Sequence, residues 1–167
     1  SSANLTSASL ISADLTNVQL FQANLFGANL SSADLSSADL TDVTLTNADL
    51  TGANLLGAIL TNANLSFATL NGANLIDASL NNADLNNANL SSAFLFGADF
   101  SNTILANAIG LDSTFGDFAT LYNANTDFTG TFFDPVAAGW TLVAVPEPST
   151  ALLLGLGLLG MAARMRA

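Results

Sequence analysis

Leucine recurs at every fifth position from Leu5 to Leu105, and Phe100 is the single replacement in that series. Two residues before each of these positions stands alanine, from Ala3 onward, replaced only by Val18, Val43 and Thr103. On an α-helix five residues advance by about 500°, so the leucines would spiral around every side. On a flat strand successive leucines would point to opposite faces. A period of five therefore excludes both regular elements as the unit that buries these side chains.

A chain that turns a corner after every five residues can bury the pattern. Each segment then presents its leucine and its alanine to one central axis, and the chain coils as a solenoid. Alanine at the second inward position leaves room for the leucines in a narrow coil. The Ser, Thr, Asn, Asp and Gly residues between them are typical of tight turns and of a polar exterior. The regular leucine excludes a disordered low-complexity tract.

The segments "SADLS", "TNANL", "NGANL" and "NNADL" resemble the A(D/N)LXX units of the pentapeptide-repeat family. The resemblance covers residues 3–105. It implies an all-β fold, a right-handed quadrilateral β-helix with four pentapeptides in each coil, so that residues four repeats apart stack on one another. We expect three parts in the chain: the repeat β-helix at 1–105, a cap and linker at 106–145, and a sorting and anchor segment at 146–167.

This stacking predicts an apolar stripe on the outside of the solenoid. Leu56, Ile76 and Phe96 each follow an inward leucine of one column, and Phe94 lies close by. Comparable outward positions elsewhere carry mostly Thr, Ser and Asn, so a contiguous apolar stripe indicates a contact surface. The alternative is that the following segment of the chain folds back and covers the stripe, since the end of a solenoid needs a cap.

Residues 106–145 are rich in aromatic side chains, and the repeat persists there only in fragments such as "ATLYN" and "TDFTGTFFDP". Bulky residues in degenerate coils predict a terminal plug, because the last coil otherwise exposes its leucines and its unpaired edge. An aromatic ligand cleft is the alternative, although no polar or ionisable groups converge there in the sequence.

The last residues, "VPEPSTALLLGLGLLGMAARMRA" at 145–167, break the repeat completely. Their apolar run at 151–163 predicts a short hydrophobic helix, below the roughly 17 to 25 residues of a comfortable membrane span. The segment resembles a PEP-CTERM sorting signal at five positions, Pro146, Glu147, Pro148, Arg164 and Arg166. A buried core helix is the alternative, which the three glycines and the lack of a polar face disfavour.

The PEP-CTERM resemblance implies recognition and processing by an exosortase-type enzyme. It also implies export to the cell envelope or extracellular matrix of a Gram-negative bacterium, with a transient inner-membrane anchor through the C-terminal segment before processing. Such export requires an N-terminal signal peptide, and the chain enters the repeat at once with "SSANL". We therefore expect a signal region to precede it.

Composition excludes several kinds of site. The chain carries 13 acidic residues against two basic ones, a net charge of -11, and it has no histidine or cysteine. Direct nucleic-acid binding is excluded, since it relies on Lys and Arg. The usual nucleophiles, bases and zinc ligands are missing too. Asp14 and Asp34 would stack as a carboxylate pair, but their column continues as Asn54, Asn74 and Phe94 without building a site. We expect no enzyme, no catalytic residue, no cofactor and no metal.

Two function classes remain. The first is an exported, non-enzymatic structural or interaction protein of the surface or matrix, whose polar side chains bind polysaccharide and whose stripe joins copies or partners. The alternative is a DNA mimic that binds a topoisomerase such as gyrase, as some pentapeptide-repeat proteins do. The net charge favours that comparison, whereas the scattered placement of the acids along the columns disfavours it.

Overall fold

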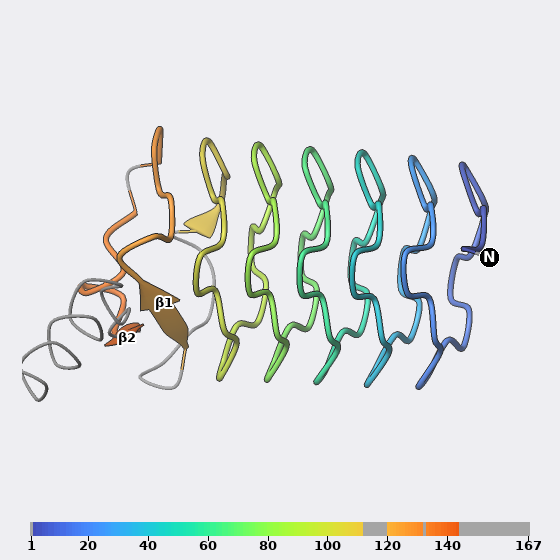
Figure 1. The fold of residues 1–167 in the computed structure, drawn as a ribbon, viewed down its shortest axis with the longest axis horizontal. Helices are drawn as coiled ribbons and strands as arrows, with labels where there is room; N and C mark the ends of the chain where they lie inside the picture. The colour runs from blue at the N-terminus through green and yellow to red at the C-terminus, as the bar shows by residue number, and fades with distance from the viewer. Residues whose placement is uncertain (1, 112–119, 132, 144–167) are drawn as a thin grey trace, which may run out of the picture.

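The protein is a stack of small coils that forms a rod, as Figure 1 shows. The computed structural model describes residues 2–111, 120–131 and 133–143. Parallel backbone bridges join residues 20 positions apart, for example Asn4 to Asn24 and Asn24 to Thr44. Each regular coil therefore contains four pentapeptides, and the fold is an all-β solenoid. The residue between the alanine and the leucine of each repeat makes the bridge.

A tight turn follows every inward leucine of the repeat. The amide of Ala48 donates to the carbonyl of Leu45 at 3.0 Å, and the same bond recurs at the other corners. The third residue of each turn has a positive φ, 58° at Asn47 and 63° at Gly52. Gly, Asn and Asp tolerate this conformation best, which explains their frequency at this position, and Ser occurs there as well. Gln22 and Phe67 are exceptions, with φ values of 57° and 59°.

The inward leucines and alanines form one continuous core along the axis of the rod. From Ala23 to Phe100 the inward side chains are almost completely buried. The leucines of the first coil, Leu5, Leu10 and Leu15, are only partly buried against this core. Alternating large and small side chains fill a narrow coil without voids, which is why the second inward position is so often alanine.

Threonine takes the place of inward alanine toward the C-terminal end. The hydroxyls of three buried threonines donate to backbone carbonyls of the preceding coil: Thr103 to Leu80 at 2.7 Å, Thr120 to Leu95 at 2.8 Å and Thr126 to Phe100 at 2.8 Å. A buried hydroxyl without a partner would cost free energy, so these bonds make the substitution tolerable.

The winding keeps its interval of 20 as far as Ile109, which is bridged to Asn89, and then loses it. Asp99 is bridged to Leu121 and Ile104 to Asp127, which are intervals of 22 and 23 residues. The strands β1 (Leu121–Asn123) and β2 (Thr141–Val143) then pair in parallel, with Leu121 opposite Thr141. In the fragment "ATLYN", the described residues 120–123 continue the solenoid, with Thr120 and Tyr122 pointing inward.

Five aromatic side chains pack at the C-terminal end of the core. The rings of Phe100 and Trp140 stack with centroids 5.1 Å apart, and Trp140 also contacts Tyr122, Phe128 and Phe133. The rings thus lie against Phe100, a fully buried inward residue of the regular coils, and the plug stays a prediction. The division of the chain at 105 and 145 stays a prediction, because residues 112–119, 132 and 144–145 lie outside the described part.

Within residues 2–111, 120–131 and 133–143, no helix is long and apolar enough to cross a membrane. The expected hydrophobic helix at 151–163 lies outside the described residues.

Candidate interaction surface

Asn and Asp recur before the inward leucines because their side chains close the following turn. The Oδ1 atom of Asp34 accepts the amide of Ser36 at 3.0 Å, and Asn64 and Asn89 bind the amides of Ser66 and Ser91 at the same distance. This bond from a side chain to the amide two residues later is a common local turn. Most of the Asn and Asp residues therefore have a structural role at the surface.

The column that contains Asp14 and Asp34 forms a side-chain ladder. The Nδ2 atom of Asn54 donates to Oδ1 of Asp34 at 3.0 Å, and Nδ2 of Asn74 donates to Oδ1 of Asn54 at 3.0 Å. The structure brings Asp14 and Asp34 together as neighbours on adjacent coils, and Phe94 follows Asn74 in the column. The ladder orders the amides but leaves no group poised for proton transfer.

Hydrogen bonds lower the pKa of the two stacked carboxylates. For Asp34 the strongest cause is the hydroxyl of Ser36, followed by the backbone amide of Ser36, and the amide of Asn54 adds to them. For Asp14 the hydroxyl and amide of Thr16 lower the pKa, and the nearby charge of Asp34 opposes them. Both groups are therefore stabilised as anions. Among the described residues, no three acidic side chains cluster in a way that would hold a metal ion.

The apolar stripe consists of Leu56, Ile76, Phe94 and Phe96, and three of its members stack in one column. The amide of Gly57 donates to the carbonyl of Ile76 at 2.8 Å, and the amide of Asp77 donates to that of Phe96 at 2.9 Å. Leu56, Phe94 and Phe96 are 41%, 41% and 36% exposed, and Ile76 is half-buried. These side chains thus keep much of their surface accessible.

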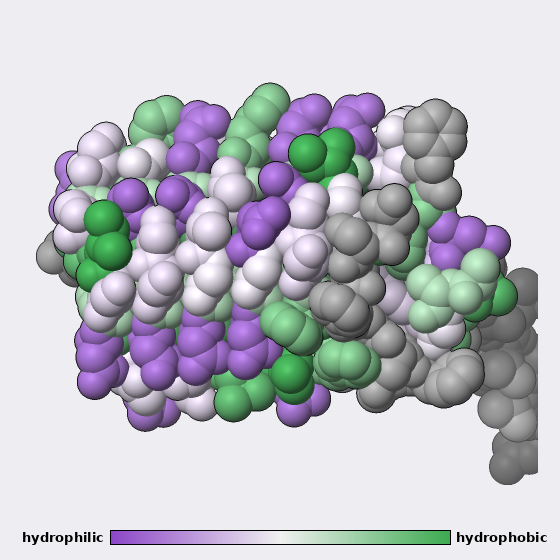
Figure 2. Space-filling model, turned by 180° about the vertical axis from the view of Figure 1, so that it is seen from behind, coloured by the Kyte–Doolittle hydropathy of each residue, from purple (hydrophilic) through white to green (hydrophobic). Residues whose placement is uncertain are grey.

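Ile59 extends the apolar stripe around the corner of the rod. It is 44% exposed, it stands three residues after Leu56, and its backbone is bridged to Asp39 and Ser79. The sequence contains the signal for this residue, since Ile59 interrupts the polar outward series Gln19, Asp39, Ser79 and Asp99. Figure 2 shows polar rows on one face of the rod that give way to apolar side chains toward the C-terminal end.

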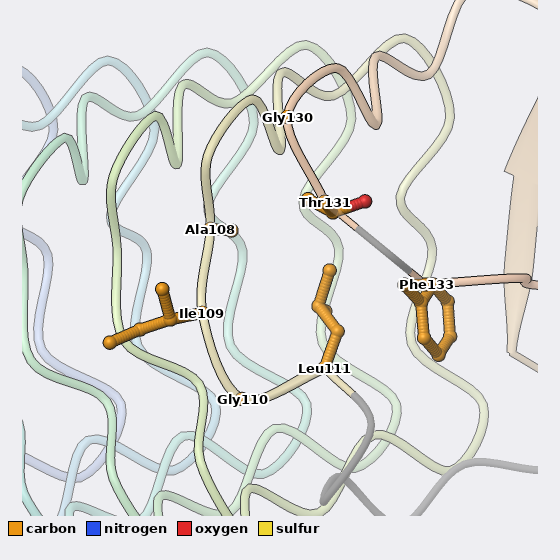
Figure 3. A pocket seen from close by; sticks show the side chains of 7 residues that line it. All are labelled: Ala108, Ile109, Gly110, Leu111, Gly130, Thr131 and Phe133. Atoms are coloured by element: carbon orange, nitrogen blue, oxygen red, sulfur yellow. The ribbon is translucent and has the colours of Figure 1, made fainter.

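A cavity of about 390 Å³ opens beside the C-terminal end of the regular coils. Figure 3 shows its walls, which come from the segment Ala108–Leu111 and from Gly130, Thr131 and Phe133. Among the described residues of the lining, the only polar side chain is that of Thr131, whose hydroxyl donates to the carbonyl of Phe128 at 2.8 Å. Since this hydroxyl is already engaged, the described lining offers no converging polar groups for a ligand.

The five residues of the predicted sorting signal, Pro146, Glu147, Pro148, Arg164 and Arg166, lie outside the described residues.

Comparison with protein families gives two matches. The model for pentapeptide repeats, with eight copies, matches residues 3–42, 38–75 and 70–107. The model for the PEP-CTERM protein-sorting motif matches residues 144–167. The search of the curated proteins returned no match.

Several solved structures are similar to the chain. A pentapeptide repeat protein from Nostoc is 34% identical, with 66% of this chain and 84% of that chain covered and a TM-score of 0.48. HetL, a pentapeptide repeat protein involved in heterocyst differentiation regulation in Nostoc, is 29% identical over 78% of this chain, with a TM-score of 0.45. The match spans 65% of the length of HetL.

The plasmid-mediated fluoroquinolone resistance protein QnrB1 is 20% identical, with 94% of this chain and 96% of that chain covered. The TM-score of 0.53 shows that the two proteins are similar in fold.

Proposed function

We propose a function from the premise that this chain belongs to the pentapeptide-repeat family and carries a PEP-CTERM sorting motif. The protein is an exported, non-enzymatic structural or interaction protein of the cell envelope or extracellular matrix of a Gram-negative bacterium. An exosortase-type enzyme sorts it and processes it near Pro146, Glu147 and Pro148. The observation that supports this most directly is the order of the two matches, with the repeats at 3–107 and the sorting motif after them at 144–167.

In this proposal the rod is right-handed and quadrilateral, and a short hydrophobic helix at 151–163 anchors it in the inner membrane until processing. Residues 106–145 serve as cap and linker. The rod then acts through its surface. Polar side chains such as Asn54 and Asn74 offer amides to extracellular polysaccharide, and the apolar stripe is the site for a partner. Pentapeptide-repeat proteins are typically structural or interaction proteins, and the chain has no His, Cys or Lys for the usual acid–base or nucleophilic chemistry.

The test is intact mass combined with fractionation of the native protein from its own cells. We expect the protein in the envelope or medium, lacking the residues beyond the PEP motif. Recovery from the cytoplasm with Arg166 still attached would contradict the proposal.

The second candidate is a DNA mimic that binds a topoisomerase such as gyrase. Its support is the net charge of -11 and the fold likeness to QnrB1 at 20% identity. A mimic needs acids in continuous tracks like those of phosphates, whereas the column of Asp14 and Asp34 continues as Asn54, Asn74 and Phe94. A supercoiling assay with purified gyrase tests this candidate, and full activity at excess protein would exclude it.

A further inference from the structure

The apolar stripe is bordered by carboxylates. Asp77 directly follows Ile76, and its carboxylate lies against Gly97, the residue after Phe96. On one side of the stripe, Asp34 occupies the column of Phe94, three coils nearer the N-terminus, and its neighbour on the next coil is Asn54. A border of acids around apolar side chains is therefore built into the stacking of the coils.

Two further acids lie on the face that adjoins the stripe around the corner. Asp39 is bridged directly to Ile59, and Asp99 is bridged to Ser79, the next residue of that column after Ile59. Asp34, Asp39, Asp77 and Asp99 together form the acidic border of the apolar stripe.

The acidic border has no neutralising partner in the described part of the chain. Residues 2–143 contain no Lys, Arg or His, so no side chain there pairs with these carboxylates as a cation. The hydrogen bonds that Asp34 and Asp99 accept come from neutral amides and from the hydroxyls of Ser36 and Ser101. A cationic group brought by a partner would form charge-assisted bonds that the protein itself does not supply.

The charge distribution also argues against two other occupants. A second copy of the chain would bring its own net charge of -11 against the acidic border, and a surface of anionic lipids would be repelled in the same way. The acidic border does not repel a partner that has apolar side chains and positive charge.

We propose that the apolar stripe and its acidic border bind a protein segment that carries apolar anchors flanked by lysine or arginine. This inference rests on the proposed function, in which the rod acts through its surface, and names the chemistry of the partner. The apolar anchors bury against Leu56, Ile76 and Phe96 and supply most of the affinity. The acidic border steers the partner and fixes its register.

Fluorescence anisotropy of labelled peptides with the purified full chain tests this proposal. The probe is a synthetic amphipathic peptide of leucine and lysine. Its companions replace every leucine by serine or every lysine by glutamate. We expect the leucine–lysine peptide to bind at least about tenfold more tightly than either companion, since both the apolar and the cationic groups are needed. Equal binding of the leucine–glutamate peptide would overturn the proposal.

Variants of the full chain locate the binding. Ile76→Ser and Asp77→Asn each weaken binding of the leucine–lysine peptide, by about tenfold for Ile76→Ser. The matched controls are Phe26→Ser, which removes another exposed apolar side chain, and Asp84→Asn, which removes an acid on another face. Circular dichroism checks that each variant is folded. Equal effects of the stripe variants and the controls would overturn the proposal, because they show general attraction to an acidic rod.

Light scattering of the full chain without peptide addresses the competing occupant. A monomer supports the proposal. A dimer that Ile76→Ser abolishes would overturn it, since the stripe would then bind a second copy. These results are independent of the proposed export, which the fractionation experiment tests: a rod that reaches the surface yet binds no peptide refutes the partner alone.

Discussion

Trp140 stacks on Phe100 with an interplanar angle of 17°, although the two residues are 40 positions apart in the sequence. Because Leu121 pairs with Thr141, Trp140 occupies the place above Thr120, in the column where the regular coils carry alanine. A tryptophan fits there because the described part of the rod adds no further coil beyond it. Its indole covers the end of the leucine core.

The stacking predicts a large loss of stability for Trp140→Ala. Trp140 is 5% exposed, and removal of a buried aromatic side chain costs about 3 to 5 kcal/mol in the free energy of unfolding. Urea denaturation followed by circular dichroism measures the change. Phe26→Ala is the control, since Phe26 is 45% exposed and its truncation should cost much less. Similar losses for both variants would show that Trp140 does not close the core.

Asp34 predicts a pH-dependent contribution to stability. Its pKa in the folded protein lies below the ordinary value of 3.8, because the hydroxyl of Ser36 and two amides stabilise the anion. The stabilisation is therefore fully present above the unfolded pKa and is lost as the pH falls through the folded pKa. We expect the stability difference between the wild type and Asp34→Asn to shift against the wild type as the pH falls below about 4. Urea titrations from pH 7 to pH 2 measure it, and a difference independent of pH would contradict the assignment.

Gly72 and Gly97 occupy the same position in their turns, so alanine substitutions at the two sites compare the cost of backbone strain alone with the cost of strain plus a side-chain collision. A Cβ atom on Gly97 would collide with the carboxylate of Asp77, whereas one on Gly72 would meet nothing within 4 Å. Both residues have positive φ, 71° and 65°. Gly72→Ala should cost about 1 to 2 kcal/mol from the left-handed backbone alone. Gly97→Ala should cost more, and thermal melting of both variants compares them. A smaller loss for Gly97→Ala would refute the placement of Asp77.

Phe67 predicts a stabilising substitution. It holds a positive φ of 59° while its ring is 56% exposed, so little burial offsets the backbone strain. Phe67→Asn places a residue that is common at the other corners, and we expect the free energy of unfolding to rise by about 1 kcal/mol. The control is Phe26→Asn, at the preceding turn position, where φ is not positive and no gain is expected. Urea denaturation midpoints of the two variants measure the difference, and equal midpoint shifts for Phe67→Asn and Phe26→Asn would contradict the prediction.

The regular part of the fold follows from the sequence because one rule repeats there without interruption. Inward leucine, inward alanine and a turn in between fix every coil as far as Leu105, and stacking at a constant interval places Leu56, Ile76 and Phe96 in one column. The position of Asp14 beside Asp34 follows in the same way.

The irregular part does not follow from spacing alone. After Ile109 the intervals become 22 and 23, so counting by fives from Leu105 puts Thr120 in a leucine place, whereas it takes the alanine place and Tyr122 takes the leucine place. Tertiary packing decides there: Thr120 can turn inward because its hydroxyl reaches the carbonyl of Leu95, and Tyr122 can do so because it meets Phe128. The sequence alone shows that Ile59 is an apolar residue at an outward position. Its membership of the apolar stripe depends on the corner that brings two faces together.

The interval of 20 residues between bridged positions sets how the length of this rod can change. An insertion or deletion of one pentapeptide keeps every leucine inward, yet it rotates all later side chains to the next face. Deleting five residues between Leu56 and Ile76 would leave a folded rod whose stripe is split across two faces. A whole coil can be gained or lost with all faces intact. Within the regular coils, the surface patterns of the rod are thus preserved only when its length changes by whole coils of 20 residues.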